Sequence, residues 1–372
     1  MVSLVPFQTL GNLTNLSILY LYSNQLFRSI PHEIGMLTSI TELDFSNNGL
    51  TGSIPSSIGN LTNLSIPHLY SNQLSGSIPR EVGMLTSIRE LDLSNNSLTG
   101  SIPSSIGNLT NLSILYLYFN QLSGSIPHEI GMLTSITKLD FSNNGLTGSI
   151  PSSIGNLTNL SILFLYSNQL SGSIPREVGM LTSIRELDLS NNSLSGSIPS
   201  SIGNLTNLSI LYLYSNQCSG SIPREIEILT SITKLDFSNN GLTGSIPSSI
   251  GNLTNLSILY LYSNQLSGSI PREVGMLTYI RELDLSNNSL TGSIPSSIGN
   301  LTNLFILYLY SNQLSGSITR EVGMLTSIRE LDLSNNSLTG SIPHEIGMLT
   351  SITDLALSNN GLTGSIPSLL ET

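Results

Sequence analysis

Pairs of acidic residues two positions apart are the first feature of this sequence that could do chemistry. Glu42 and Asp44 are such a pair, and in an extended segment their side chains lie on the same face. Two neighbouring carboxylates can serve as the catalytic pair of a glycosidase. The same pair returns at Glu90 and Asp92 and again further along the chain. Because an active site occurs once, a recurring pair indicates surface charge rather than catalysis.

The histidines and the single cysteine are the other candidate reactive groups. His32, His128 and His344 share one repeat position, and the first two are four repeats apart, roughly 19 Å at the spacing of neighbouring strands. That separation is too large for one metal ion. His68 stands alone at another position. Cys218 cannot form an intrachain disulfide, and it replaces a leucine of other repeats, which predicts a buried thiol.

No motif of a known catalytic centre accompanies these residues. The chain contains no glycine-rich phosphate loop, no Cys-x-x-Cys pair and no nucleophile elbow. Its net charge is −11 without a basic stripe, which argues against a nucleic-acid partner. No apolar run reaches the roughly 18–20 residues that span a bilayer. The sequence therefore predicts a protein that is not an enzyme, holds no metal or cofactor and does not itself insert into a membrane.

A fixed period positions all of these residues. Asparagines recur every 24 residues from Asn24 to Asn360, and the unit around them reads L-x-x-L-x-L-x-x-N-x-L-x-G-x-I-P-x-x-I-G-x-L-x-x. Such a period is typical of a solenoid, in which each repeat buries its apolar face against its neighbours. We assign residues 1–15 to a partial repeat, 16–351 to fourteen 24-residue repeats and 352–372 to a truncated fifteenth, in one domain of 372 residues.

Each part of the unit predicts a local structure. Leu19 and Leu21 alternate with Tyr20 and Tyr22, which is the period of a β-strand whose leucines face the interior. Strands of successive repeats then stack in parallel. The recurring asparagine ends the strand, where its amide can bind backbone groups of the turn and form an inward ladder. The Ile-Pro pair stops the opposite side from becoming a long helix.

The segment L-T-G-S-I-P at residues 50–55 recurs with small changes through almost the whole chain, and it resembles the plant-specific class of leucine-rich repeats. The chain is similar to the extracellular domains of plant leucine-rich-repeat receptor-like kinases. The resemblance implies an α/β repeat fold, a curved right-handed superhelix with a parallel sheet on its concave face. It also implies a short second strand and 3-10 or loop segments on the convex face, and a concave face that recognises peptides or other receptor ectodomains.

The same resemblance implies partners and a location for the parent protein. We expect a secreted peptide or protein ligand, a co-receptor ectodomain as a second partner, and the extracellular face of the plasma membrane or the apoplast. The first residues do not read as a secretory signal, and the chain has neither the cysteine-containing caps nor the transmembrane helix and kinase of the family. We therefore expect a chain without its own signal peptide and anchor.

A second, longer period, of two repeats, patterns the expected concave face. Odd repeats place aromatic side chains outward on the strand, whereas even repeats place an aspartate and a serine there. Tyrosine gives a large contact area at low entropic cost, as binding surfaces require. We therefore predict a groove for an extended peptide or a protein partner. The candidate ligand-binding residues are Tyr20, Tyr22, Asp44, Tyr70, Asp92, Tyr116, Tyr118, Asp140, Tyr166, Asp188, Tyr212, Tyr214, Asp236, Tyr260, Tyr262, Asp284, Tyr308 and Tyr310.

Acceptor sequences for N-linked sugar are abundant and follow the repeats. They favour an extracellular origin, since such acceptors are modified only in the secretory pathway. The repeat template also supplies Asn, Ser and Thr for its own reasons, so the sequence does not identify which acceptors carry sugar. The candidates are Asn12, Asn60, Asn95, Asn108, Asn156, Asn191, Asn204, Asn252, Asn287, Asn300 and Asn335.

Two function classes remain. The first is a ligand-binding ectodomain of a plant receptor-like kinase or receptor-like protein, in signalling or defence. The alternative is a soluble inhibitor or decoy resembling the polygalacturonase-inhibiting proteins, which share this repeat class. A transmembrane helix downstream would favour the first, and tight binding to a secreted fungal hydrolase would favour the second. The Arg-x-Arg carboxylate clamp of some peptide receptors is absent, and nothing in the sequence names the ligand.

One residue conflicts with its expected position. Pro67 stands where Leu19 and Leu115 stand in other repeats, inside a strand that has neighbours on both sides. Proline lacks the N–H that a ladder needs and is normally confined to edge strands and bulges. We expect a bulge or broken pairing in that repeat.

Overall fold

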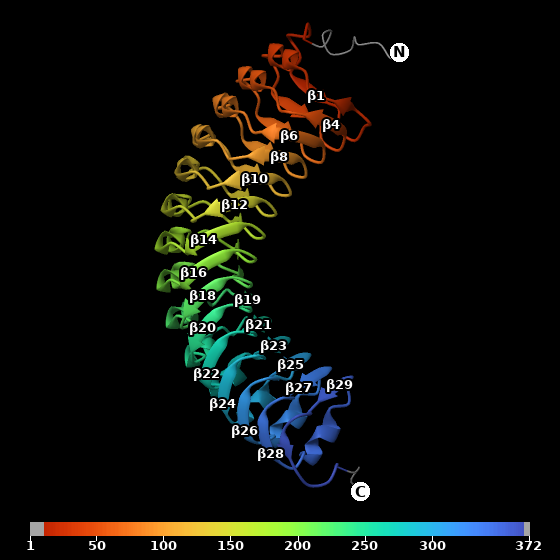
Figure 1. The fold of residues 1–372 in the computed structure, drawn as a ribbon, viewed down its shortest axis with the longest axis vertical. Helices are drawn as coiled ribbons and strands as arrows, with labels where there is room; N and C mark the ends of the chain where they lie inside the picture. The colour runs from red at the N-terminus through yellow and green to blue at the C-terminus, as the bar shows by residue number, and fades with distance from the viewer. Residues whose placement is uncertain (1–10, 368–372) are drawn as a thin grey trace. The chain divides into compact units, whose positions relative to one another are not determined.

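The computed structural model describes residues 11–367. Residues 1–10, which belong to the partial first repeat, and residues 368–372, which belong to the fifteenth, lie outside the described residues. The chain divides into two compact units, one that ends at Ser193 and one that begins at Leu194. Each unit is a stack of similar coils, one for each repeat (Figure 1).

A three-residue strand opens every repeat, and these strands form one parallel sheet in each unit, the first sheet. Its register advances by one repeat per strand, so that Ile18 pairs with Glu42 and Tyr20 with Asp44. In the first unit the strands are β1 (Ile18–Tyr20), β3 (Glu42–Asp44), β5 (Ile66–His68), β7 (Glu90–Asp92), β9 (Ile114–Tyr116), β11 (Lys138–Asp140), β13 (Ile162–Phe164) and β15 (Glu186–Asp188). In the second unit they are β17 (Ile210–Tyr212), β19 (Lys234–Asp236), β21 (Ile258–Tyr260), β23 (Glu282–Asp284), β25 (Ile306–Tyr308), β27 (Glu330–Asp332) and β29 (Asp354–Ala356).

Short strands of a second parallel sheet follow in each repeat. Those that belong to the first unit are β2 (Phe27–Arg28), β4 (Gly49–Gly52), β6 (Gln73–Ser77), β8 (Ser97–Gly100), β10 (Gln121–Gly124), β12 (Gly145–Gly148) and β14 (Gln169–Ser173). From the boundary onward they are β16 (Ser193–Ser197), β18 (Gln217–Gly220), β20 (Gly241–Gly244), β22 (Gln265–Ser269), β24 (Ser289–Gly292), β26 (Gln313–Ser317), β28 (Ser337–Gly340) and β30 (Gly361–Leu362).

A five-residue 3-10 helix closes the repeat. The first three are η1 (His32–Met36), η2 (Ser56–Asn60) and η3 (Arg80–Met84), and the series continues at the same spacing to η14 (His344–Met348). A proline precedes almost every one, as Pro55 does with φ −69° and ψ 140°, because its ring fixes φ and it has no N–H to leave unbonded. In each unit taken alone, these helices lie on the outer side of the bend and the first sheet lies on the inner side (Figure 1).

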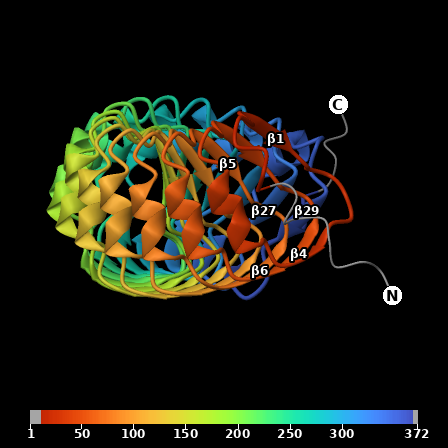
Figure 2. The same ribbon diagram turned by 90° about the horizontal axis from the view of Figure 1, so that it is seen from above.

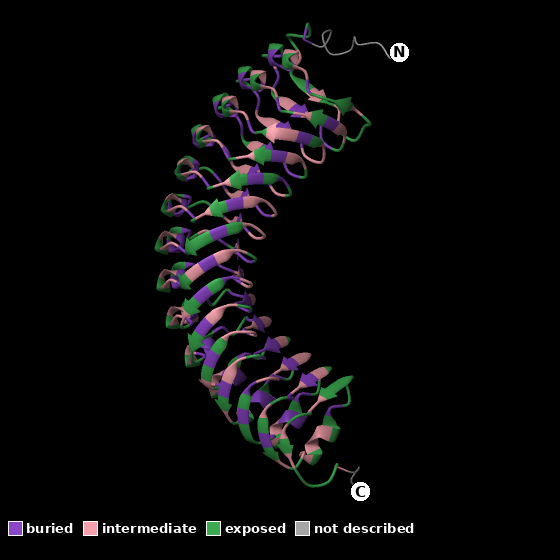
Figure 3. Cartoon of the chain, in the orientation of Figure 1, coloured by how far each residue is buried: buried purple, intermediate pink, exposed green. Residues whose placement is uncertain are grey.

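The interior of each coil is apolar, as the repeat pattern predicts. Ile40, Ile54, Ile58 and Leu61 of the second repeat are at most 4% exposed, and the equivalent residues of the following repeats are as deeply buried as far as Leu338. Figure 2, which looks down on the coils, shows successive repeats stacked behind one another, and Figure 3 shows buried positions alternating with exposed ones along the strands. The prediction of a leucine-rich-repeat solenoid with one sheet on the inner face and a second strand and 3-10 helix beyond it is confirmed.

The predicted asparagine ladder is present. The Nδ2 of Asn48 donates to the carbonyl oxygens of Leu21, Phe45 and Ser46 at 2.8–3.1 Å, and its Oδ1 accepts from the backbone N–H of Leu26 at 3.0 Å. One side chain thus satisfies the turn of its own repeat and joins it to the preceding repeat. The same contacts recur at later asparagines, so the ladder ties each coil to the next.

Pro67 breaks the sheet on one side only. Towards the preceding strand all three residues of β5 keep their partners, including Leu43 opposite Pro67. Towards the following strand only His68 and Asp92 remain paired, whereas other neighbouring strands in the same unit pair through three residues. The N–H that proline lacks would have pointed to that following strand. The expected loss of pairing is therefore confirmed, and it is confined to one edge of the repeat.

Candidate ligand-binding face

The predicted site residues lie on the outward side of the first sheet and just after its strands; we name this surface the first-sheet face. The register places Tyr20, Asp44, His68, Asp92 and Tyr116 side by side in one row. The second unit continues the same alternation, for example with Asp236 beside Tyr260 and Tyr260 beside Asp284. Sequence reasoning therefore identified which of these residues become neighbours. Their role in binding stays a prediction.

Aromatic side chains on this face come in pairs, one pair for each odd repeat from the first to the thirteenth; in the third repeat the pair is His68 and Tyr70. The rings of Tyr116 and Tyr118 meet edge to face with their centroids 5.9 Å apart, and Tyr260 and Tyr262 do the same at 6.1 Å. Edge-to-face contacts of this kind hold the rings in fixed positions. The pairs therefore present a rigid, half-buried aromatic surface at every second repeat.

Aspartates on the strands between these pairs are held by the serine two residues on. The Oδ1 of Asp92 accepts a hydrogen bond from the backbone N–H of Ser94 at 2.9 Å and one from its hydroxyl at 2.6 Å. Burial raises the pKa of Asp92, and the two bonds from Ser94 oppose that rise. Burial likewise raises the pKa of Asp140 and Asp188. These carboxyl groups are therefore held close to the strands, between the aromatic pairs, and do not project into solvent.

The structure also contains contacts that sequence reasoning missed. The hydroxyl of Tyr20 donates to the carboxylate of Glu42, and Tyr260 and Tyr308 bond in the same way to a glutamate of the next repeat. This bond is the largest cause of the raised pKa of the Tyr20 hydroxyl. The signal in the sequence is a glutamate that follows a tyrosine at a separation of 22 residues. A comparison of equivalent positions does not find this signal, because a separation of 22 residues is shorter than one repeat of 24. The bond therefore runs diagonally between neighbouring strands.

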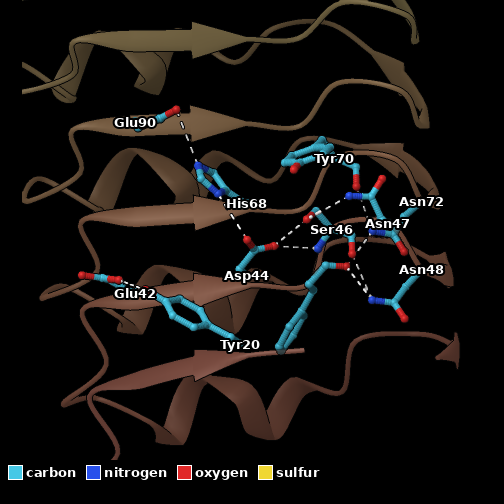
Figure 4. Close-up of polar contacts among 11 residues, drawn as sticks. Tyr20, Glu42, Asp44, Ser46, Asn47, Asn48, His68, Tyr70, Asn72 and Glu90 are labelled. Atoms are coloured by element: carbon cyan, nitrogen blue, oxygen red, sulfur yellow. Dashed lines mark hydrogen bonds and ion pairs between the residues drawn. The ribbon is translucent and has the colours of Figure 1, made fainter. Parts of the chain in front are cut away.

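His68 is the one histidine on this face among the described residues. Its Nδ1 lies 3.5 Å from Oδ2 of Asp44, and its Nε2 lies 3.5 Å from Oε1 of Glu90 (Figure 4). The imidazole therefore takes the position of a tyrosine ring between the carboxylates of two neighbouring strands. The aromatic surface of this face, interleaved with carboxylates, is suited to apolar and basic groups of a ligand.

The acceptor asparagines are all exposed, and they lie in two places. Those of the Asn-Leu-Thr type between Asn60 and Asn300 end 3-10 helices, away from the first-sheet face. Those of the Asn-Asn-Ser type occupy the turn after a first-sheet strand with φ near 50°, as Asn95 does. Sugar on the first group would leave the first-sheet face open.

Other chemistry has little support in residues 11–367. Within them no three His, Cys, Asp or Glu side chains gather as a metal ion would need. No helix of this described part has the length and apolarity to cross a membrane. Cys218 is 1% exposed, and burial raises the pKa of its thiol to about 11, so the sulfur is a packing group and a poor nucleophile.

Comparison with known proteins identifies the family. The sequence matches the model of the leucine-rich repeat region over residues 3–126, 116–221 and 250–368, and that of the single leucine-rich repeat over 231–253. No curated protein sequence matches the chain.

Solved structures similar to this chain include plant receptors. The plant peptide hormone receptor RGFR1, solved with RGF2, is 39% identical with a TM-score of 0.91 over 98% of this chain, which spans 62% of the receptor chain. The Arabidopsis receptor kinase HAESA, solved with the peptide hormone IDA and the co-receptor SERK1, is 32% identical with a TM-score of 0.65, over 96% of this chain and 72% of that one. A plant ice-binding protein is 34% identical with a TM-score of 0.56, over 62% of this chain and 74% of that one.

These matches and the two repeating sheets define the class of the molecule: the chain belongs to the leucine-rich-repeat family. Within that family, its repeats are those of the ectodomains of plant receptor kinases.

Proposed function

We propose that this chain is a non-catalytic recognition module, a ligand-binding ectodomain of a plant receptor kinase or receptor-like protein that works in signalling or defence outside the plasma membrane. It binds a peptide or protein through the first-sheet face. The single observation that carries this proposal is the row of rigid aromatic pairs alternating with fixed carboxyl groups on that face. The proposal is supported by the receptor relatives, which hold a peptide hormone and, for HAESA, a co-receptor.

The ligand is expected to lie along the strands' stacking direction rather than in a pocket. Aromatic pairs recur at every second strand, roughly 9.6 Å apart at the usual strand spacing. An extended chain advances about 3.3 Å per residue, so about every third ligand residue meets an aromatic pair. The carboxyl groups between the pairs favour basic side chains at those points.

Alanine substitution at Tyr116, Tyr212 and Tyr260 tests this function. Each change removes an aromatic anchor, and we expect each to weaken a bound peptide by about tenfold or more, as loss of a central tyrosine does in other interfaces. Ser104→Ala and Ser152→Ala, on 3-10 helices of the outer side, are the matched controls and should leave affinity unchanged. Binding is measured by calorimetry with RGF2 and IDA and with peptides selected from a displayed library. Equal losses from both sets would remove the case for the first-sheet face.

A second candidate function is ice binding by the outer side of the second sheet. A hydroxyl side chain recurs there at one position of each repeat from Thr51 to Thr339. Between β6 and β8, Ser75 lies opposite Ser97 and Ser77 opposite Thr99, and Ser77 and Thr99 are exposed. Strands about 4.8 Å apart set a regular lattice of these groups. The plant ice-binding relative supports this candidate.

Bulky substitutions on the hydroxyl lattice separate the two functions. Ser125→Tyr and Thr147→Tyr, both at exposed positions, should abolish inhibition of ice recrystallisation if the second sheet binds ice, because they break the regular spacing. The Tyr116→Ala protein is the control and should keep that inhibition. Absence of ice activity in the unmodified chain would eliminate this candidate and leave the peptide-binding proposal untouched.

A further inference from the structure

All methionines of the described residues lie at one position of the repeat, and all are exposed. The position is the last residue of a 3-10 helix, and the exposed fraction runs from 49% at Met324 to 56% at Met348. The methionines are Met36, Met84, Met132, Met180, Met276, Met324 and Met348, and Ile228 occupies the same position. We name this set the methionine row. A row of half-exposed apolar side chains is unusual on a surface otherwise made of polar and charged residues such as Ser105, Arg80 and His32.

Acceptor asparagines fill the same position in the intervening repeats. In the first unit, Met36, Asn60, Met84, Asn108 and Met132 follow one another at the ends of successive 3-10 helices. Each of these asparagines is exposed and begins the sequence Asn-Leu-Thr. Apolar side chain and sugar acceptor therefore alternate along a single row.

Two of these side chains, those of Met36 and Met324, lie against the backbone beside the acceptor of the preceding repeat. A methyl group added at Gly299 would lie 3.2 Å from Sδ of Met324, and one added at Gly11 would lie 3.1 Å from Sδ of Met36. Gly299 directly precedes the acceptor Asn300, and Gly11 also directly precedes an acceptor. The thioether thus rests on the backbone beside the asparagine that would carry the sugar.

We propose that N-linked sugar on these asparagines covers the methionine row. The modification joins Nδ2 of the asparagine to the anomeric carbon of the first N-acetylglucosamine. The nitrogen loses a proton, the bond from that carbon to the lipid pyrophosphate breaks, and the lipid pyrophosphate leaves. The C–H face of that sugar packs on the flexible thioether of the next repeat, which adapts its shape to what covers it. The sugar thereby shields the exposed methionine side chains from solvent. This proposal does not depend on which ligand the first-sheet face binds.

Met348 provides an internal control. It follows Met324 directly in the row, so no acceptor asparagine stands at the end of the preceding 3-10 helix. Met324 and Met348 are otherwise similar in exposure, at 49% and 56%. Protection by sugar should therefore reach Met324 and not Met348.

Peroxide oxidation of the full chain, secreted from plant cells, tests the proposal. Sulfoxide at each methionine is followed over time by peptide mass spectrometry, together with occupancy of Asn300. We expect Met324 to oxidise at least about twofold more slowly than Met348, because sulfoxide formation follows exposure. Thr302→Ala, which removes the acceptor sequence but keeps Asn300, should bring Met324 to the rate of Met348, and Thr302→Ser should retain protection.

Enzymatic removal of the sugar from the folded protein repeats the comparison without a variant. It should speed oxidation of Met324 and leave Met348 unchanged. Two results would overturn the proposal: an unoccupied Asn300 in the secreted chain, or equal oxidation rates of Met324 and Met348 while Asn300 carries its sugar.

Discussion

Replacing Asn120 with alanine should destabilise the first unit by about 2–4 kcal/mol, at roughly 1–3 kcal/mol for each buried polar group left without a partner. Asn120 is 9% exposed. Its Nδ2 donates to the carbonyl oxygens of Leu93 and Leu117 at 3.0 and 3.1 Å, and its Oδ1 accepts from the N–H of Leu98 at 2.9 Å. Alanine can replace none of these bonds.

Asn24 is the control for this substitution. It occupies the same repeat position but is exposed, so water can replace the bonds that its Nδ2 makes to Leu21 and Tyr22. Chemical denaturation combined with hydrogen exchange at Leu98 measures the effect, because a repeat protein can open locally before it unfolds as a whole. Equal, small losses from Asn24→Ala and Asn120→Ala would show that the ladder adds little to stability.

Replacing Gly83 with alanine is the second change with a large expected effect. A Cβ at this position would lie 2.4 Å from the backbone oxygen of Ser105 in the next 3-10 helix. A backbone oxygen cannot move aside as the end of a flexible side chain can, so the two 3-10 helices must move apart to admit the methyl group. We expect a loss of about 1–3 kcal/mol, the usual cost of overpacking, in denaturation experiments. Gly347→Ala is the control, since nothing lies within 4 Å of a Cβ there.

The chain contains a substitution of this kind already. Glu227 stands where other repeats have this glycine. The hydrogen bond from the Ser249 hydroxyl to the carbonyl of Arg224, which joins the two helices there, is 3.3 Å long, whereas the equivalent bond from Ser105 to Arg80 is 2.7 Å. The longer bond agrees with helices held further apart by the extra side chain. Glu227→Gly should therefore stabilise the second unit, and an unchanged or lowered stability would contradict the packing argument.

The strict period explains why so much of the fold could be predicted. An apolar residue that recurs once in every repeat must meet its copy in the next coil, so the core, the first strand and the inward asparagines follow from stacking. The second strand was expected only from the resemblance to plant leucine-rich repeats. Contacts between unlike positions do not follow. The bond from Tyr20 to Glu42 depends on how far one coil slides past the next, which no single repeat encodes. The sequence also did not show on which side of β5 Pro67 breaks the pairing, because that depends on whether the N–H at this position points to the preceding or the following strand.

The contacts of the first-sheet face could be predicted only in part for the same reason. Which residues point outward follows from alternation along a strand, and the structure places Tyr20 beside Asp44 as expected. The burial of Asp92 and its bonds to Ser94 depend on the rings on either side. The methionine row could have been found as a recurring apolar residue at a polar position. The contact of Met36 and Met324 with the backbone beside the acceptor of the preceding repeat depends on how the side chains pack in three dimensions.

The alternation of tyrosine and aspartate along the first-sheet face also constrains how such a gene can change in length. If two repeats are gained or lost together, strands with aromatic residues still alternate with strands with acidic residues. If a single repeat is gained or lost, two strands of the same kind become neighbours. The last two repeats have the arrangement that such a single step would produce. Glu330 stands opposite Asp354, two like charges on adjacent strands, and Asp332 stands opposite Ala356 where an aspartate would complete a second clash. Copy number in this array should therefore vary in pairs, and an unpaired loss should be followed by point mutations that neutralise the seam.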